Sequence, residues 1–253
     1  MSVLETKGLT MRFGGLTAVS DFNLTLGKGE LVGLIGPNGS GKTTVFNMIT
    51  GFYKPTEGRI LHNGREITGL RPDQIATLGI ARIFQNSRLF RELTVLDNVL
   101  IGHHLRLRSS PFGAILRLPG YVRQEKQSYE EAMTLLQGLG LVDVVGEVAG
   151  SLPYGLQRKL EVARALATRP SLLLLDEPAT GMSPEETTEM MDFILGVRHS
   201  FEMTILLIEH HMRVVMGICE RMAVLDYGKT IAKGNPEEIQ NNPEVIEAYL
   251  GAE

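Results

Sequence analysis

The sequence lacks the features that would place it among secreted, membrane-spanning or nucleic-acid-binding proteins. Its 253 residues include a single cysteine, so no internal disulfide can form and a reducing compartment fits. No apolar run reaches the roughly 18 residues that a membrane span requires, and residues 1–10 show no export signal. The net charge is −4 and no long basic run occurs, which argues against a nucleic-acid partner. We therefore expect any membrane role to come through a partner.

The composition, with 43% hydrophobic and 21% charged residues, is typical of a globular protein. Short apolar runs bounded by turn residues predict strands at 3–12, 22–26, 31–35, 58–65, 80–85, 172–175, 204–208, 223–226 and 230–232. Apolar residues at helical spacing predict helices at 44–50, 95–102, 123–139, 156–168, 237–250 with a break near Pro243, and after Ser183 as N-cap. The Asn63-Gly64 pair predicts a tight hairpin. Because several strands are apolar throughout, we expect an α/β fold with a mostly parallel sheet.

One segment predicts a nucleotide site. The eight residues after the strand at 31–35 fit the pattern G-x-x-x-x-G-K-[ST]: Gly36, Pro37, Asn38, Gly39, Ser40, Gly41, Lys42 and Thr43. The glycines let several backbone N–H groups converge on a phosphate, and the following helix adds its partial positive charge. Lys42 supplies a full charge for the terminal phosphates, the Thr43 hydroxyl can bind Mg²⁺, and Thr44 completes the predicted contacts. The alternative is a glycine-rich turn that happens to precede a lysine.

A second segment favours a hydrolysing enzyme. The apolar run at 172–175 ends in two adjacent carboxylates, Asp176 and Glu177. At the end of a strand both side chains can reach one cleft, where Asp176 would orient Mg²⁺ and Glu177 would take a proton from the attacking water. An exposed acidic turn is the alternative. The sequence contains no Asn-Lys-x-Asp segment, which disfavours a GTPase.

With these motifs in this order, the chain resembles the ATP-binding subunit of an ABC transporter over nearly its whole length. The resemblance implies a P-loop, RecA-like core with an antiparallel β subdomain and an inserted helical lobe. It also implies that Phe13 stacks on adenine, that Gln85 contacts Mg²⁺ and the attacking water, and that His210 contacts the γ-phosphate. Each of these three residues, taken alone, has an ordinary structural interpretation.

The expected organisation is one ABC ATPase domain, with the nucleotide-binding core and β subdomain at 1–90 and 157–253. The helical lobe is expected at about 91–156 and lies within the core sequence. Residues 103–126 of the lobe hold five Lys or Arg residues against one acidic residue. This stretch is expected either to face a membrane partner or anionic headgroups, or to form a solvated cover of the lobe.

The family signature, Leu-Ser-Gly-Gly-Gln followed by Gln-Arg, is altered at residues 152–158. Pro153 replaces the serine whose hydroxyl would bond the γ-phosphate of the opposite nucleotide, and proline has no N–H to offer instead. Tyr154 and Gly155, at the start of the following helix, remain as predicted nucleotide contacts. Ser183 stands where the family has an aspartate. The resemblance implies two chains that sandwich two ATP molecules head to tail, so a second ABC ATPase subunit is expected, in a heterodimer or a homodimer.

The tyrosine in the signature and the tail at 241–251 resemble the larger ATPase subunit of branched-chain amino-acid importers. The implied function is ATP hydrolysis that powers import of leucine, isoleucine and valine through transmembrane permease subunits, at the cytoplasmic face of the inner membrane. A related importer for urea or other amides shares much of this pattern. A soluble ABC ATPase acting on DNA or ribosomes is disfavoured, because heptad arms and a basic face are absent. A regulatory subunit that binds ATP without hydrolysing it is disfavoured by Glu177, Gln85 and His210.

Overall fold

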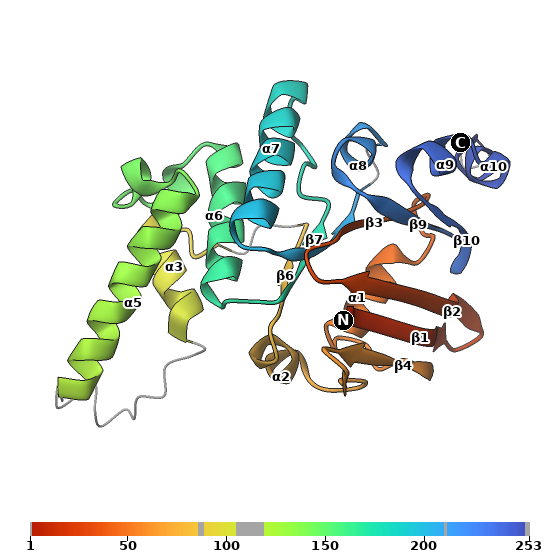
Figure 1. The fold of residues 1–253 in the computed structure, drawn as a ribbon, viewed down its shortest axis with the longest axis horizontal. Helices are drawn as coiled ribbons and strands as arrows, with labels where there is room; N and C mark the ends of the chain where they lie inside the picture. The colour runs from red at the N-terminus through yellow and green to blue at the C-terminus, as the bar shows by residue number, and fades with distance from the viewer. Residues whose placement is uncertain (1, 86–88, 105–118, 210–211, 251–253) are drawn as a thin grey trace. The chain divides into compact units, whose positions relative to one another are not determined.

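The computed structural model describes residues 2–85, 89–104, 119–209 and 212–250 of the 253-residue chain. By its internal contacts the chain divides into two units, one formed by residues 1–85 and 171–253 and the other by residues 86–170. The first unit contains two β-sheets and the second is built around helices (Figure 1).

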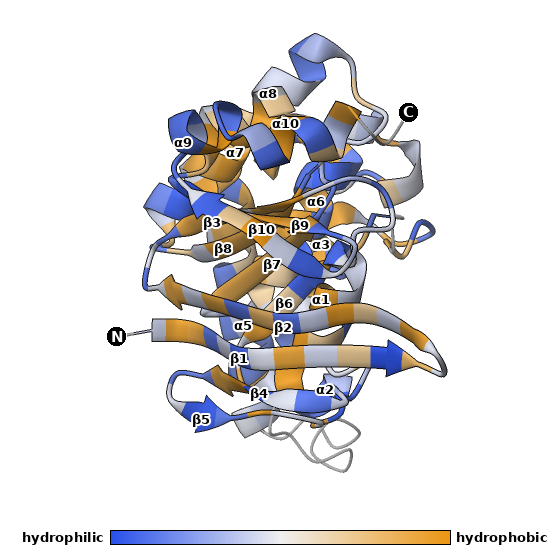
Figure 2. Ribbon diagram, turned by 90° about the vertical axis from the view of Figure 1, so that its right-hand side faces the viewer, coloured by the Kyte–Doolittle hydropathy of each residue, from blue (hydrophilic) through white to orange (hydrophobic). Residues whose placement is uncertain are grey.

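The larger sheet of the first unit has six strands in the order β10-β9-β3-β8-β7-β6. Their bounds are β3 (Leu31–Ile35), β6 (Ile80–Ile83), β7 (Leu172–Asp176), β8 (Thr204–Ile208), β9 (Arg221–Asp226) and β10 (Lys229–Gly234). Neighbours are parallel except β9 and β10, which form an antiparallel hairpin. Every residue of β3, β7 and β8 is buried, which explains their apolar sequences (Figure 2). The prediction of a mostly parallel sheet is confirmed.

The second sheet is antiparallel and has the strand order β2-β1-β4-β5. Its strands are β1 (Ser2–Phe13), β2 (Leu16–Gly27), β4 (Glu57–His62) and β5 (Arg65–Glu66). Asn63 and Gly64 join β4 to β5 with φ values of 49° and 77°, the left-handed backbone that a tight hairpin requires. The hairpin predicted from this pair is confirmed, although its second strand is short.

An apolar cluster joins both sheets through helix α1 (Lys42–Ile49). The cluster includes Leu4 and Phe22 from the antiparallel sheet, Phe46 from α1, and Leu174 and Leu206 from the parallel sheet. Burial of such side chains contributes roughly 1.5–3 kcal/mol each to folding. Since α1 follows the glycine-rich loop directly, this packing holds the loop between the two sheets.

Further helices of the first unit are α2 (Pro72–Thr77), α7 (Pro184–Ser200), α8 (Met212–Ile218), α9 (Pro236–Gln240) and α10 (Pro243–Leu250). Ser183 caps α7 as predicted: its Oγ accepts from the Glu186 backbone N–H at 3.2 Å, and the Glu186 carboxylate accepts from the Ser183 N–H at 2.9 Å. The predicted break in the last helix is also present, between α9 and α10. Helices α2 and α8 were not predicted, since each has only six or seven residues.

The second unit consists of α3 (Val95–His104), α5 (Pro119–Gly138), α6 (Tyr154–Ala167) and the short 3-10 helices η1 (Val142–Val144) and η2 (Ala149–Ser151). Helices α3 and α6 pack closely at Gly102, where a Cβ atom would lie 2.6 Å from the Arg164 carbonyl oxygen. This close packing is why α6 belongs to the second unit, whereas the sequence pattern had placed the helix at 156–168 in the core.

Helix α5 is 20 residues long and carries both signs of charge. In the part of the chain that the structure describes, no helix is both long and apolar enough to cross a bilayer. Most of the basic stretch expected at 103–126 falls at 105–118, outside the described residues.

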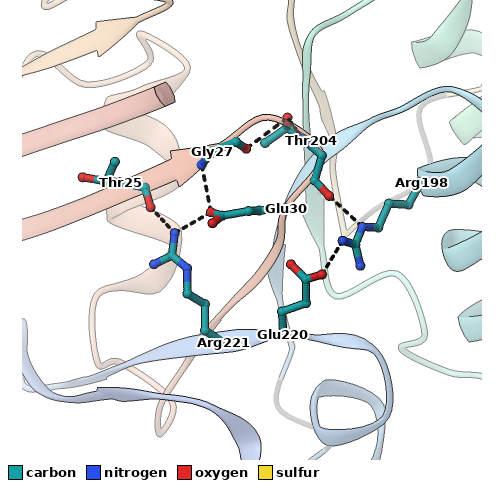
Figure 3. Close-up of polar contacts among 8 residues, drawn as sticks. Thr25, Gly27, Glu30, Arg198, Thr204, Glu220 and Arg221 are labelled. Carbon is teal, nitrogen blue, oxygen red and sulfur yellow. Dashed lines mark hydrogen bonds and ion pairs between the residues drawn. The ribbon is translucent and has the colours of Figure 1, made fainter. Parts of the chain in front are cut away.

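A polar network joins the segments that lead into the parallel strands, at the ends remote from the glycine-rich loop (Figure 3). The Glu30 carboxylate, just before β3, accepts from Arg221 of β9 at 2.6 Å and from the Gly27 N–H at 2.8 Å. Burial alone would raise the pKa of Glu30, but these hydrogen bonds hold it below its usual value. Arg198 of α7 pairs with Glu220 at 2.5 Å. The network therefore fixes the starts of β3 and β9 against α7.

His62 is a buried, neutral link at the end of β4. Its Nδ1 donates to the Val3 carbonyl oxygen at 2.9 Å, and its Nε2 accepts from the Ser171 hydroxyl at 3.0 Å. The residue is only 3% exposed, and burial lowers its pKa. Protonation at Nε2 would remove the acceptor that Ser171 uses.

We expect acidification to destabilise the protein through His62. The folded-state pKa lies below the roughly 6.5 of an unfolded chain, so the unfolded state takes up a proton first as the pH falls. The contribution of His62 is complete above about pH 6.5 and decreases below it by up to about 1.4 kcal/mol per pH unit. Urea unfolding at two pH values either side of 6.5 measures this, and His62→Gln should lose less stability between them than the wild type. His199→Gln, at an exposed histidine, is the control and should behave like the wild type. An unchanged pH dependence in His62→Gln would contradict the assignment.

Candidate nucleotide site

The glycine-rich loop connects β3 to α1. At Gly36 and Gly41 there is no room for a side chain, so only glycine fits. Gly36, Gly39 and Gly41 have φ values of 146°, 79° and 105°. A Cβ on Gly36 would lie 2.0 Å from the Leu225 carbonyl oxygen, and one on Gly41 would lie 2.6 Å from that of Ala18. The loop is therefore packed against β9 and β2, and the predicted strand–loop–helix arrangement is present.

Lys42 opens α1 and is folded back onto the loop. Its ammonium donates to the carbonyl oxygens of Gly36 and Pro37, both at 2.8 Å. Burial lowers the pKa of Lys42, and the nearby charges of Glu177 and Asp176 oppose that shift. The lysine is thus a buried cation between the loop and two carboxylates.

The other predicted loop positions differ in exposure. Ser40 is buried, Pro37 and Thr44 are half-buried, and Asn38, Gly39 and Thr43 are exposed. The Thr43 hydroxyl therefore lies at the surface of the first turn of α1, where a ligand can reach it. This arrangement suits backbone contacts to a phosphate from the loop and a hydroxyl contact from the helix.

Glu177 follows β7 directly and is held by two donors. The Gln85 amide donates to Glu177 Oε2 at 2.7 Å, and the Thr180 hydroxyl donates to the same oxygen at 3.1 Å. Its backbone adopts φ 49°, and its N–H donates to the Ile208 carbonyl oxygen at 2.9 Å. The structure thus brings together Gln85 and Glu177, as the motifs predict, and adds Thr180, which the sequence did not single out.

Asp176, one residue earlier, is buried and ion-paired. Its Oδ2 accepts from Arg82 Nη2 at 2.6 Å, with both side chains less than a tenth exposed. The adjacent carboxylates therefore have different contacts: Asp176 is ion-paired with Arg82, and Glu177 accepts from Gln85 and Thr180. Arg82 was missed from the sequence, although a charged residue in a four-residue apolar strand was the available signal.

Phe13 lies at the end of β1 and is 42% exposed. Its ring packs edge-on against Tyr53, with the centroids 5.3 Å apart. The two rings form an exposed aromatic pair in the same unit as the loop, and Tyr53 was not predicted. Adenine stacking by Phe13 remains a prediction.

His210 lies outside the described residues, so its predicted contact with the γ-phosphate remains a prediction. The preceding Glu209 is fully buried, and its carboxylate accepts from the Ala179 N–H at 3.1 Å. Glu209 thereby ties the end of β8 to the turn after Glu177. The sequence pattern had not assigned Glu209 a role.

The altered signature opens α6 in the second unit. Pro153 occupies the N-cap position, and no side chain caps the helix. The Tyr154 hydroxyl accepts from Arg158 Nε at 3.0 Å, and the guanidinium of Arg158 lies 5.2 Å from the centre of the tyrosine ring. Arg158 in turn pairs with buried Glu161 at 2.8 Å. Tyr154 is therefore oriented by its own helix, while Gly155 has open space beside it.

The C-terminal helix α10 lies next to the glycine-rich loop. The two border a cavity of about 590 Å³, whose lining includes Pro37, Asn38, Glu244 and Glu247. Burial raises the pKa of Tyr249 on α10, and the Gly36 backbone partly opposes the shift. The tail, which the sequence singled out only for its family resemblance, thus adjoins the candidate site.

Fold and site together define a P-loop NTPase, with a glycine-rich loop and lysine after one parallel strand and a carboxylate pair after another. The profile described as ABC transporter matches residues 19–180, and that described as branched-chain amino acid ATP-binding cassette transporter matches residues 229–253. The chain belongs to the ABC transporter family.

Similar proteins cover almost the whole chain. The high-affinity branched-chain amino acid transport ATP-binding protein LivG of Escherichia coli strain K12 is 49% identical over 98% of each chain. BraF of Pseudomonas aeruginosa, named for the same transport, is 46% identical over 98% of each chain. The crystal structure of the ADP conformation of MJ1267, an ATP-binding cassette of an ABC transporter, has a TM-score of 0.86 at 32% identity over 99% of each chain. The predicted fold class and family resemblance are confirmed.

Gly36→Ala should weaken nucleotide binding strongly. The new Cβ would overlap the Leu225 carbonyl oxygen, so the loop must shift. We expect at least about a tenfold higher Kd for ATP, about 1.4 kcal/mol, measured by calorimetric titration. Gly64→Ala is the matched control, since Gly64 has φ 77° with open space around it. That variant should lose roughly 1 kcal/mol of stability from its left-handed backbone and keep its ATP affinity. Equal ATP affinity in both variants would contradict this account of the loop.

Proposed function

We propose that this chain is the ATP-hydrolysing subunit of an importer for branched-chain amino acids. The observation that carries the hydrolytic assignment is the Glu177 carboxylate, which Gln85 and Thr180 orient in the unit that contains the P-loop. The substrate class is supported by LivG and BraF, whose names specify branched-chain amino acid transport and which align over nearly the full chain.

ATP would bind along the loop at residues 36–44. The backbone N–H groups of the loop and the first turn of α1 would hold the phosphates, and Lys42 would exchange its carbonyl contacts for phosphate oxygens. Phe13, beside Tyr53, would support the adenine ring. His210 is assigned to the γ-phosphate on the family resemblance.

Mg²⁺ would be held by Thr43, Asp176 and Gln85 together with the phosphates, and it would neutralise charge on the transferring phosphoryl group. These oxygen donors suit a hard cation. Among the described residues no cluster of three or more His, Cys, Asp or Glu could hold a metal alone. That agrees with a cation that relies on few protein ligands and on substrate phosphates.

Glu177 would act as general base. It would accept a proton from the water that attacks the γ-phosphorus, as ADP leaves. Gln85 and Thr180 bind the same oxygen, Oε2, so the carboxylate plane is fixed before the water arrives. A preset orientation of this kind lowers the entropic part of the barrier.

The chain would work with a second ABC ATPase subunit and with transmembrane permease subunits, at the cytoplasmic face of the inner membrane. Each ATP would lie between one chain's P-loop and the other chain's signature. In this chain the signature offers Tyr154, Gly155 and the start of α6, with Pro153 in place of a hydroxyl. ATP-dependent closure of the dimer would then move the permease.

Replacing Glu177 with Gln should nearly abolish hydrolysis. An amide cannot take the proton, so kcat should fall about 10²–10⁴-fold while ATP affinity changes little. Phosphate release by the assembled transporter measures kcat, and titration with ATP measures affinity. Glu189→Gln, at an exposed position on α7, is the matched control and should keep full turnover. Full turnover by Glu177→Gln would rule out the general-base assignment.

Pro153→Ser should change turnover much less than Glu177→Gln. In a heterodimer whose partner has an intact signature, this chain's P-loop and Glu177 would complete the better site, and Pro153 would serve the other site. ATPase rates of complexes carrying Glu177→Gln or the equivalent change in the partner test this asymmetry. Equal losses from the two changes would show that the sites are equivalent.

A further inference from the structure

Arg82 is a buried cation in β6, three positions before Gln85. Its guanidinium connects two elements: Nη2 donates to Asp176 Oδ2 at the end of β7 at 2.6 Å, and Nη1 donates to Asn47 Oδ1 of α1 at 2.7 Å. The side chain is 5% exposed. One residue of β6, the strand that precedes Gln85, is therefore bonded both to the carboxylate assigned to orient Mg²⁺ and to the helix that follows the P-loop.

Aromatic rings complete the surroundings of Arg82. The guanidinium carbon lies 4.5 Å from the centre of the Phe84 ring and 5.5 Å from that of Phe46. Its Nε has no hydrogen-bond partner in the part of the chain that the structure describes. A charge buried in this way is costly unless it is paired. Asp176 and Asn47 therefore determine where the guanidinium sits.

Asp176 also acts on a second cation, Lys42. The charges of Glu177 and Asp176 favour the protonated lysine and oppose the effect of burial on its pKa. Lys42 nevertheless donates to the Gly36 and Pro37 carbonyl oxygens. An unpaired carboxylate in these low-dielectric surroundings would be drawn to that ammonium, because opposite charges attract far more strongly there than in water.

We propose that Arg82 is a positioning residue of the ATP site, which holds the Asp176 carboxylate away from Lys42 and leaves the ammonium available to phosphate oxygens. Asn47 anchors the guanidinium from α1, and the ring centres of Phe84 and Phe46 lie 4.5 and 5.5 Å from its central carbon. The inference rests on the proposed function, because it concerns the same ATP site.

The test is ATP affinity in EDTA, where neither Mg²⁺ nor hydrolysis contributes. Arg82→Met should raise the Kd at least about tenfold, because Asp176 then competes with the phosphates for Lys42. Asp176→Asn alone should bind ATP within about threefold of the wild type, which is less than 0.7 kcal/mol. The double variant Arg82→Met/Asp176→Asn should return to that range, because the competing charge is gone. Calorimetric titration of the full chain gives the Kd and, separately, the number of competent sites.

Two further variants grade the effect. Arg82→Lys keeps a cation beside Asp176 and should retain most of the ATP affinity. Asn47→Ala removes one anchor, keeps both charges, and should raise the Kd about threefold. The Asn47→Ala variant still tests the inference if Arg82→Met does not fold. Arg71→Met is the matched control, since Arg71 pairs with Asp73 by the same chemistry at the surface and should leave the Kd unchanged.

The outcomes separate the possible roles of Arg82. A merely structural role would lower the unfolding temperature and the number of competent sites, and would leave the Kd of the folded protein unchanged, which overturns the inference. A double variant that binds as weakly as Arg82→Met would also overturn it, because Asp176 would not be the competitor. If the wild type itself failed to bind ATP, that result would overturn both the proposed function and the inference.

Discussion

Parallel pairing of β3, β8, β7 and β6 is the constraint on which the site depends. The register aligns Leu34 with Ile208, Asp176 with the same Ile208, and Ile83 with Leu175. Because parallel strands end at one edge of a sheet, everything that follows these strands emerges there. That edge collects the loop after β3, Glu209 after β8, Asp176 at the end of β7 with Glu177 directly after it, and Gln85 after β6.

This edge also concentrates features that destabilise a fold when they stand alone. Lys42, Asp176, Arg82 and Glu209 are charged and buried, or nearly so. Glu177 adopts a left-handed backbone, which costs a residue with a Cβ roughly 1–2 kcal/mol. Asp176 pairs with Arg82 of the neighbouring strand, Glu209 accepts from the Ala179 N–H after β7, and Lys42 donates to its own loop, so each buried group has a partner. Buried charges and a strained backbone that cluster at one edge of a sheet are typical of a functional site.

The features that could be predicted from the sequence are those specified by residues close together in the chain. Buried strands, the capped start of α7, the Asn63-Gly64 hairpin and the P-loop are each specified by a few neighbouring residues. Gln85 and Glu177, 92 positions apart, could be expected at one attacking water only through the family resemblance. The Arg82–Asp176 pair spans 94 positions and belongs to no such motif, so no local pattern indicates it. Helix α6 shows a related limit, since an amphipathic pattern indicates that one face is buried but does not indicate against which element.

The altered signature makes the proposed ATP site of the chain more complete than the surface that α6 would offer to a partner's ATP. Glu177 accepts from Gln85 and Thr180, which both belong to the first unit. The start of α6 differs: a serine at the N-cap would present a hydroxyl, whereas Pro153 presents none and cannot cap the helix. The Tyr154 hydroxyl accepts from Arg158 one turn later, which fixes its position on α6, and a hydroxyl that accepts still carries a proton to donate. In the proposed dimer, α6 would offer a partner's nucleotide its backbone, its dipole and the Tyr154 side chain. If each ATP lies between two chains as we propose, this chain is better equipped to hydrolyse its own ATP than to complete the site of its partner.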